Sequence, residues 1–445
     1  MSLLKNRLGR KRDSVQKESS ESFKSLKNKS SIIDALQKKI DSLAKSDNIK
    51  KPPVFLESRQ TDFKSNSSIK SQNNTEESAR LPGKVVATPL GNVWVNRIEY
   101  KDYYHGDKPA DAYLKAGRSL GILARNPGIE KLDPSGALFV DTETTGLSGG
   151  SGTIPFLIGV GWFTESAFIV EHLFCRTPDE EPAQLYLLTK HMKRAEYLVS
   201  FNGKSFDIPL INNRFIMNRI ANPGYNLSHL DLLHLSRRVF GRRLTDRSLQ
   251  NLERVVLNFK REGDIPGSEI PDVYKAYLSG EDKFTVAKVL EHNALDIVAL
   301  AALGGELDNM YRNPDSVAFV QDSLGLAREA FGAGAVTNGT AHLNHAGVMG
   351  SMDEKTVALH MAARYEAKKK SYKKAASIWL EIIKLDKYDA SASLSLAKYY
   401  EHREKNLERA LKYAKKTAEI EGESASEHRQ NRIKRKMAKQ KSLLS

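Results

Sequence analysis

The chain of 445 residues contains very little cysteine, because Cys175 is the only one. A single cysteine excludes a disulfide within the chain and a cysteine-rich zinc module. This usage is typical of a reducing compartment, so we expect a cytoplasmic protein. Long apolar runs are also missing. The longest, residues 154–163, is about half of the roughly 20 residues that a membrane-spanning helix needs, and we therefore expect no membrane as a partner.

Negative charge is scarce in two parts of the chain. Residues 1–80 hold 18 Lys and Arg against 10 Asp and Glu, and residues 361–445 hold 22 against 11, whereas residues 81–360 hold 29 against 33. The net charge of +15 therefore comes from two basic flanks around a slightly acidic block. Basic flanks attract polyanions, and nucleic acid is the obvious one. A role in solubility alone is the alternative.

The first flank is rich in small polar residues. Residues 1–80 contain 16 Ser and many Lys, Asn and Gln, which predicts a disordered basic arm. The basic residues at its start are not followed by an apolar segment, so we expect no secretory signal.

The most informative feature is a pair of acids at the end of an apolar stretch. Residues 137–140 are Ala-Leu-Phe-Val, apolar without alternation, which predicts a strand covered on both faces. Asp141 and Glu143 follow, and alternate residues of a strand share a face. Two carboxylates on one face repel each other unless a cation lies between them, and hard oxygen ligands suit Mg²⁺ or Mn²⁺. Two ordinary acids at a solvated strand end are the alternative.

Two further segments place acids in suitable settings. Residues 197–209 predict a strand, a polar turn and a helix, with Asp207 near the helix N-terminus, where the macrodipole favours an acid. Residues 291–303 predict a helix on which His292 and Asp296 lie four residues apart on one face. Taken alone, each is compatible with a plain structural role.

Together, three runs resemble the DEDD 3′→5′ exonucleases of the ribonuclease H-like superfamily, and specifically their YprB-like branch. The runs are DTETTGL at 141–147, FNGKSFD at 201–207 and HNALD at 292–296, within a resemblance that covers about residues 132–307. The segments HLDLLHL (229–235), RSLQNLE (247–253) and DIPG (264–267) also resemble that branch. The resemblance implies an α/β fold with a mixed sheet flanked by helices. It also implies two divalent ions, Mg²⁺ or Mn²⁺, held by Asp141, Glu143, Asp207 and Asp296.

The resemblance further implies that His292 accepts the proton of the attacking water. In those families the equivalent residue is a Tyr four residues before the last Asp or a His five before it, whereas His292 lies four before Asp296. A shift of one residue turns a helical side chain by about 100°. We expect contacts with the substrate from residues beside the site, namely Thr144, Leu147, Phe201, Asn202 and Lys204.

The order of the predicted elements fits this fold. Residues 81–131 predict a β-rich lead-in, and residues 132–310 the catalytic domain. Strands are expected at 137–143, 156–163 and 167–174; the short turns between them make them antiparallel. A helix at 182–194 then leads to a strand at 198–201, which is expected to be parallel to its neighbour.

The last part of the chain predicts helices that repeat. Met361–Tyr365 recurs as Ser395–Tyr399, 34 residues later, a period that resembles tetratricopeptide repeats. Two such repeats within residues 311–428 are few for a free-standing array, so we expect them to pack on residues 316–357 or on a protein partner. Residues 429–445 are expected to form a basic tail, either a solvated helix end or a nucleic-acid-binding arm.

These observations predict a metal-dependent 3′→5′ exonuclease that acts on single-stranded or frayed ends of DNA or RNA. Two alternatives remain open at this stage. The domain binds nucleic acid without cutting it and recruits partners through its repeats, or it is a structure-specific endonuclease.

Overall fold

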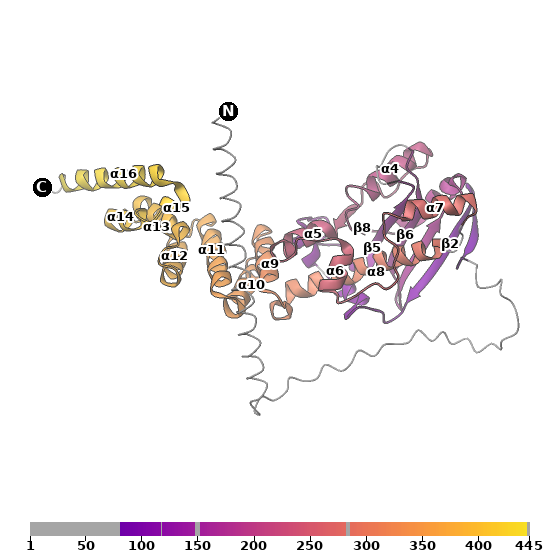
Figure 1. Ribbon diagram of the computed structural model, residues 1–445, viewed down its shortest axis with the longest axis horizontal. Helices are drawn as coiled ribbons and strands as arrows, with labels where there is room; N and C mark the ends of the chain where they lie inside the picture. The colour runs from indigo at the N-terminus through magenta and orange to yellow at the C-terminus, as the bar shows by residue number, and fades with distance from the viewer. Residues whose placement is uncertain (1–80, 117, 147–151, 282–284, 443–445) are drawn as a thin grey trace, which may run out of the picture. The chain divides into compact units, whose positions relative to one another are not determined.

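A computed structural model describes residues 81–116, 118–146, 152–281 and 285–442. Within these ranges, seven strands form one mixed sheet in the order β1-β2-β7-β6-β5-β8-β9 (Figure 1). The predictions for residues 1–80 and for Leu147 lie outside the described residues. The strands of this sheet are β1 (Lys84–Thr88), β2 (Gly91–Tyr100), β5 (Ala137–Thr144), β6 (Pro155–Phe163), β7 (Phe168–Phe174), β8 (Tyr197–Ser200) and β9 (Ser228–Asp231).

The pairing of the central strands confirms the predicted topology. Strands β5, β6 and β7 are antiparallel neighbours, and β8 is parallel to β5 after the crossover through α3 (Glu181–Met192). The β-rich lead-in belongs to the same sheet, because β2 pairs with β7 from Trp94↔Phe174 to Tyr100↔Phe168. The mixed sheet with helices on it is the α/β class expected from the sequence.

Alternation along β5 divides the core into two layers. Leu138 and Val140 pack with α3 and with α4 (Asp207–Met217) on one face of the sheet. Ala137 and Phe139 pack on the other face, against α8 (Thr285–Arg312). Every side chain of β5 up to Val140 is therefore buried, and the acids come at the point where the strand leaves this sandwich.

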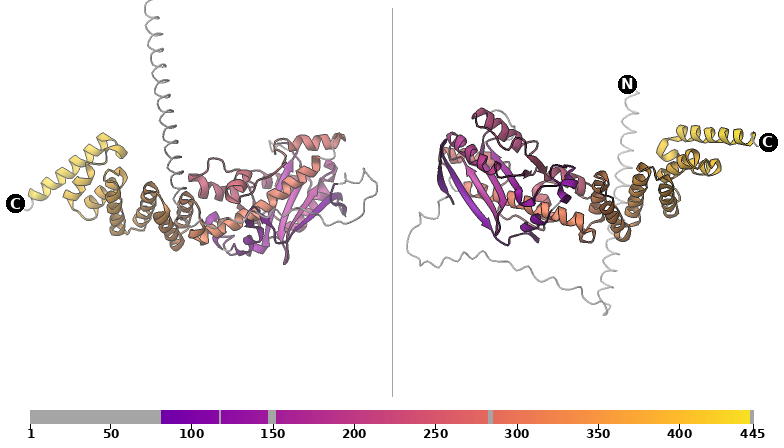
Figure 2. Two further views of the ribbon diagram at one scale, coloured as in Figure 1. Left: turned by 60° about the horizontal axis from the view of Figure 1, so that its bottom comes forward. Right: turned by 180° about the vertical axis from the view of Figure 1, so that it is seen from behind.

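Helix α8 runs along the sheet and is buried for most of its length (Figures 1 and 2). From Ala294 onward most of its apolar side chains belong to the largest apolar cluster of the described residues, whereas Val286, Val289 and Leu290 belong to a smaller one. At Gly304 it approaches the short helix η2 (Ala110–Lys115), where a Cβ would lie 2.6 Å from the ring of Tyr113. The helix that carries His292 and Asp296 is thus held from several sides.

Shorter elements complete the domain around these layers. Two strands, β3 and β4, form a separate hairpin. Helices α5 and α6 lie beside the acidic end of β5 and the part of α8 that carries Asp296. These elements are β3 (Tyr104–His105), β4 (Lys108–Pro109), α2 (Arg118–Ala124), η3 (Pro134–Gly136), η4 (Pro178–Glu180), α5 (Leu232–Val239), η5 (Phe240–Arg242), α6 (Leu249–Val256), α7 (Ile270–Ser279) and η6 (Pro314–Ser316).

The C-terminal part is all helical, and its successive helices pack on one another. Met361–Tyr365 lies in α11 and Ser395–Tyr399 in α13, and α11 packs on α9 and α10, as expected for support from residues 316–357. Residues 429–442 belong to α16, which packs on α14. The helices are α9 (Val320–Gly332), α10 (Val336–Met349), α11 (Met352–Lys368), α12 (Tyr372–Leu385), α13 (Ala390–His402), α14 (Leu407–Ala414), α15 (Ala418–Glu421) and α16 (Glu423–Ser442).

The charges of α16 are used partly within the fold. Arg432 and Lys436 both bind the carboxylate of Glu401, at 2.7 Å each, and Arg429 binds Glu421. None of the described helices is both long and apolar enough to span a membrane.

The close approach at Gly304 yields a test of the fold. We expect Gly304→Ala to lower the free energy of unfolding by up to about 2 kcal/mol, since an overpacked core costs about 1–3 kcal/mol and Ala gains back roughly 1 kcal/mol over Gly in a helix. The ring of Tyr113 cannot yield easily, because its hydroxyl lies 3.1 Å from that of Tyr197. Urea denaturation measures the change.

Gly347→Ala is the matched control, because Gly347 also lies in a helix but a Cβ there meets no atom within 4 Å. This variant should be as stable as the wild type or more stable. Equal effects of the two substitutions would contradict the close packing at Gly304.

Candidate metal centre

The alternation of β5 continues into its acidic end. Asp141 and Glu143 follow the parity of Phe139 and therefore face α8, where Asn293 Nδ2 donates a hydrogen bond to Asp141 Oδ2 at 2.8 Å. Thr142 faces the opposite layer, and its hydroxyl donates to Asp207 Oδ1 at the start of α4. Strand β5 thus connects acids from both layers at one end of the sheet.

His292 lies within reach of the carboxylates in spite of its unusual position on the helix. Its Nε2 is 3.4 Å from Asp296 Oδ2 and 4.0 Å from Glu143 Oε1. Its Nδ1 is 2.8 Å from Asp264 Oδ1. An ionised carboxylate only accepts hydrogen bonds, so Nδ1–H is the donor in this contact, and Nε2 is the ring nitrogen that faces Asp296 and Glu143.

A buried network of hydrogen bonds holds Asp296 through Oδ1, the oxygen that does not lie beside His292. Arg261 donates to Asp296, and it also binds Glu253 at 2.9 Å and Asp264 at 3.1 Å. Glu253 is fully buried and receives a second hydrogen bond, at 2.7 Å, from the fully buried His105. Arg261 therefore fixes the guanidinium-bound oxygen of Asp296 and neutralises only part of the surrounding negative charge.

The pKa values of the acids are raised, in part by this excess of negative charge. Burial and then the repulsion of the other carboxylates raise the pKa of Asp141 and Glu143 well above the usual range. Burial raises the pKa of Asp207 to about 6, although the hydrogen bond from Thr142 opposes the rise. Burial also raises the pKa of Asp296, with Arg261 acting against it. The acids are protonated more easily than ordinary carboxylates because nothing in the described structure balances all of them.

The donor set fits a hard divalent cation. Glu143, His292 and Asp296 each offer one ligand atom, and these three atoms lie within 4.8 Å of one another. Asp141 and Asp207 are outside that tightest group, yet repulsion from Asp207 helps to raise the pKa of Glu143 and of Asp141, and repulsion from Glu143 and Asp296 helps to raise that of Asp141. Carboxylate oxygens are the preferred ligands of Mg²⁺ and Mn²⁺, and an imidazole whose other nitrogen binds a carboxylate is a common arrangement at metal sites.

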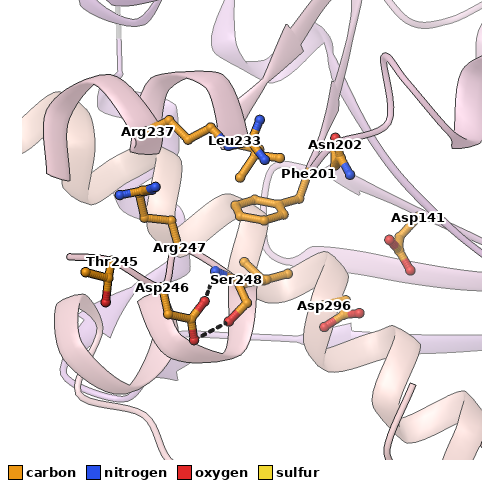
Figure 3. A pocket seen from close by; sticks show the side chains of 11 residues that line it. Asp141, Phe201, Asn202, Leu233, Arg237, Thr245, Asp246, Arg247, Ser248 and Asp296 are labelled. Atoms are coloured by element: carbon orange, nitrogen blue, oxygen red, sulfur yellow. Dashed lines mark hydrogen bonds between the residues drawn. The ribbon is translucent and has the colours of Figure 1, made fainter. Parts of the chain in front are cut away.

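The residues expected to contact substrate have different surroundings. Phe201 and Asn202 line a cavity together with Asp141 and Asp296 (Figure 3). Lys204 is exposed, and Thr144 lines a separate hollow that includes Asp207. Asp231 holds the loop that carries Phe201, Asn202 and Lys204, because its carboxylate accepts hydrogen bonds from the backbone N–H groups of Asn202 and Lys204.

Comparison with known proteins agrees with this architecture. Residues 138–307 match the family model described as the RNase H superfamily. The chain is also similar to the uncharacterized protein YprB of Bacillus subtilis (strain 168), with 28% identity over 283 residues, which cover 63% of this chain and 68% of the relative. Residues 138–307 form an RNase H-like domain.

From the sequence we did not predict several residues of the RNase H-like domain that contact the acids or support the loop beside them. Asn293 lies three residues before Asp296, and this spacing indicates a shared helical face. Asp264 and Asp231 belong to segments that resemble the YprB-like branch, but their contacts depend on long-range packing. For Arg261 no signal in the sequence predicts a contact with Asp296, because the two are joined only by the fold.

The raised pKa of Asp207 predicts how pH affects the metal-free domain. A carboxyl whose pKa rises from 3.8 to about 6 on folding favours the folded state at low pH, and this contribution is lost as pH rises through that window. We therefore expect Asp207→Asn, relative to wild type, to gain stability between pH 5 and pH 7.5. The full shift represents roughly 3 kcal/mol, at about 1.4 kcal/mol for each pH unit by which the pKa moves, and the interval from pH 5 to pH 7.5 covers about half of it, so the expected gain is roughly 1–2 kcal/mol.

Urea denaturation in EDTA at both pH values measures this difference. The comparison with the variant is needed because burial lowers the pKa of His172 to about 3 and of His229 and His342 to about 4, and these groups favour the folded state as pH rises. A stability difference that is the same at both pH values would contradict the raised pKa of Asp207.

A second prediction concerns Gly159, which lies opposite Asp141 in the pairing of β5 and β6. A Cβ at this position would lie 1.9 Å from Asn293 Oδ1, so Gly159→Ala should displace the amide that binds Asp141. We expect a loss of about 1–3 kcal/mol in the free energy of unfolding. In an Asn293→Ala background the same change should cost clearly less, because the clashing group is gone. Additive effects in this double-mutant cycle would refute the contact.

Proposed function

We propose that the chain is a metal-dependent nuclease, and that it acts as a 3′→5′ exonuclease on single-stranded or frayed nucleic acid. The observation that carries the proposal is the set of acids from β5, α4 and α8 that repel one another at one end of an RNase H-like sheet. The RNase H-like superfamily suggests phosphodiester hydrolysis. The direction of cleavage follows only from the resemblance to the DEDD exonucleases.

In this proposal Asp141, Glu143, Asp207 and Asp296 hold two Mg²⁺ or Mn²⁺ ions. Bound there, the ions supply a Lewis acid that binds the scissile phosphate, lowers the pKa of a water molecule and stabilises the leaving oxygen. His292 accepts the proton of the attacking water through Nε2, and Asp264 positions the ring by binding Nδ1. Phe201, Asn202, Lys204, Thr144 and Leu147 contact the substrate.

The same observations support one further arrangement of the histidine. Its Nε2 lies close enough to Glu143 and Asp296 to bind a cation together with them. As a ligand, His292 would require another group to accept the proton. We favour the role as a base, because the four acids already provide the hard oxygen ligands that Mg²⁺ takes.

We also propose that α11 to α14 form two tetratricopeptide-like helix pairs that bind a protein partner. The 34-residue spacing places Met361–Tyr365 and Ser395–Tyr399 on the first helix of each pair, and successive helices pack on one another. Such a partner would bring the nuclease to its substrate, whereas the chemistry stays within the RNase H-like domain.

Cleavage of 5′-labelled single-stranded DNA and RNA in Mn²⁺ or Mg²⁺ tests the nuclease. We expect wild-type protein to shorten one of the polymers progressively from its 3′ end. Asp141→Asn should lower the rate by more than about 100-fold, since even residues behind the ligands change activity by about 10–100-fold. EDTA should abolish cleavage.

Asp272→Asn is the control, because Asp272 is an exposed acid in the first turn of α7 and has the same chemical change. It should cleave at the wild-type rate. Internal cuts without a ladder would favour the structure-specific endonuclease. No cleavage of either polymer by the wild type, with binding retained, would support the non-catalytic scaffold.

A further inference from the structure

A cavity of about 490 Å³ opens beside the acids, between the end of β5 and the helices α5 and α6 (Figure 3). Asp141 and Asp296 form one end of its lining. Arg237 of α5 and Arg247, two residues before α6, lie at the other end. The cavity therefore presents negative charge where a metal is proposed and positive charge at a distance from it.

The two arginines differ from their neighbours in forming no ion pair among the described residues. Among the described residues, no carboxylate lies within salt-bridge distance of Arg237 or Arg247, and Arg247 donates only to the carbonyl oxygen of Leu244. In contrast, Arg238 binds Glu329 at 3.0 Å and Arg243 binds Asp322 at 2.8 Å. Asp246 also lines the cavity and attracts Arg247 through its charge, but among the described residues neither arginine forms an ion pair with it. Both guanidinium groups therefore retain donors for an anion, and guanidinium matches phosphate geometry well.

The rest of the lining is mixed, with apolar side chains beside the polar Asn202, Thr245, Asp246 and Ser248. Phe201 lies between the arginines and the acids (Figure 3), and Leu233 and Leu249 also line the cavity. Phe201 is half-buried and packs partly on the main apolar cluster, which fixes the ring while part of it faces the cavity. The following residue, Asn202, adopts a left-handed backbone with φ of 66° and is held by Asp231. The aromatic wall is thus positioned before any ligand binds.

We propose that this cavity is a subsite for one unstacked nucleotide of a single strand, with its base against Phe201 and an adjacent phosphate on Arg237 and Arg247. The volume falls within the range of about 300–1,000 Å³ that is usual for small-ligand sites, and a base pair in a stacked duplex cannot enter such a cavity without being separated. Stacking on an aromatic ring is tolerant of sequence, so the subsite selects single strands and not a base. The position of the scissile phosphate at the acids rests on the proposed function, whereas binding in the subsite does not require cleavage.

Binding of a fluorescein-labelled, 5′-phosphorylated thymidine trinucleotide to the full chain in EDTA, followed by fluorescence anisotropy, tests the subsite. We expect the double variant Arg237→Gln/Arg247→Gln to bind at least about tenfold more weakly than wild type. If the pair neutralises one phosphate, the dependence of log K on log salt concentration should become shallower by about 0.7. Arg254→Gln is the matched control, because Arg254 is exposed on α6 and does not line the cavity.

A second variant separates the base from the phosphate. Phe201→Leu keeps an apolar side chain but removes the stacking surface, so it should weaken binding of the trinucleotide but not of an abasic trinucleotide. The arginine variant should weaken both probes equally. Circular dichroism of each variant confirms the fold.

The outcomes distinguish this proposal from the proposed nuclease. Unchanged binding in the arginine variant, or an equal loss in Arg254→Gln, would overturn the subsite even if the wild type cleaves nucleic acid. Selective loss of binding in the arginine and Phe201 variants would support the subsite even if the wild type cleaves nothing, and only the nuclease would then fail. Loss in the arginine variant alone, with Phe201→Leu unchanged, would leave a phosphate site and refute the base contact.

Discussion

The mutual repulsion of carboxylates at the end of β5 is the constraint on which the site depends. Burial favours the neutral form of each acid, and every neighbouring acid adds to that effect. Arg261 is shared among Asp296, Glu253 and Asp264, and its attraction for Asp141 is outweighed by burial and by the repulsion of the other acids. The domain must therefore hold these groups against a force that pushes them apart, and its rigidity comes from packing elsewhere.

That packing is supplied by the elements that carry the acids. Strand β5 is covered on both faces up to Val140, and α8 is buried along most of its length. The apolar contacts of Phe139 and Ile297 in one cluster favour the folded state, whereas Asp141, two residues after Phe139, and Asp296, one residue before Ile297, oppose it. Because both contributions lie on the same rigid elements, relaxation of the acids would require movement of the core. The geometry of the site is in this way tied to the stability of the domain.

The sequence predicts the parts of this arrangement that depend on local periodicity. Alternation in β5 places Asp141 and Glu143 on one face, and helical spacing brings His292 beside Asp296, as the structure shows. The pairing of β2 with β7 joins residues about 70 apart, and the contact of Arg261 with Asp296 joins a loop to a helix. No local pattern encodes such contacts, because they arise only when the layers assemble. The cavity with Arg237 and Arg247 was missed for the same reason.

The position of His292 bears directly on the choice between cutting and binding. A shift of one residue along a helix turns a side chain by about 100°, so the sequence left open whether the ring reaches the attacking water. The structure shows Nε2 within 4.0 Å of Glu143, with Nδ1 bound to Asp264. A protein that only gripped nucleic acid would gain nothing from buried acids, since they repel the phosphate backbone. A cation between such acids would turn that repulsion into attraction, which is why the proposed function includes the ions.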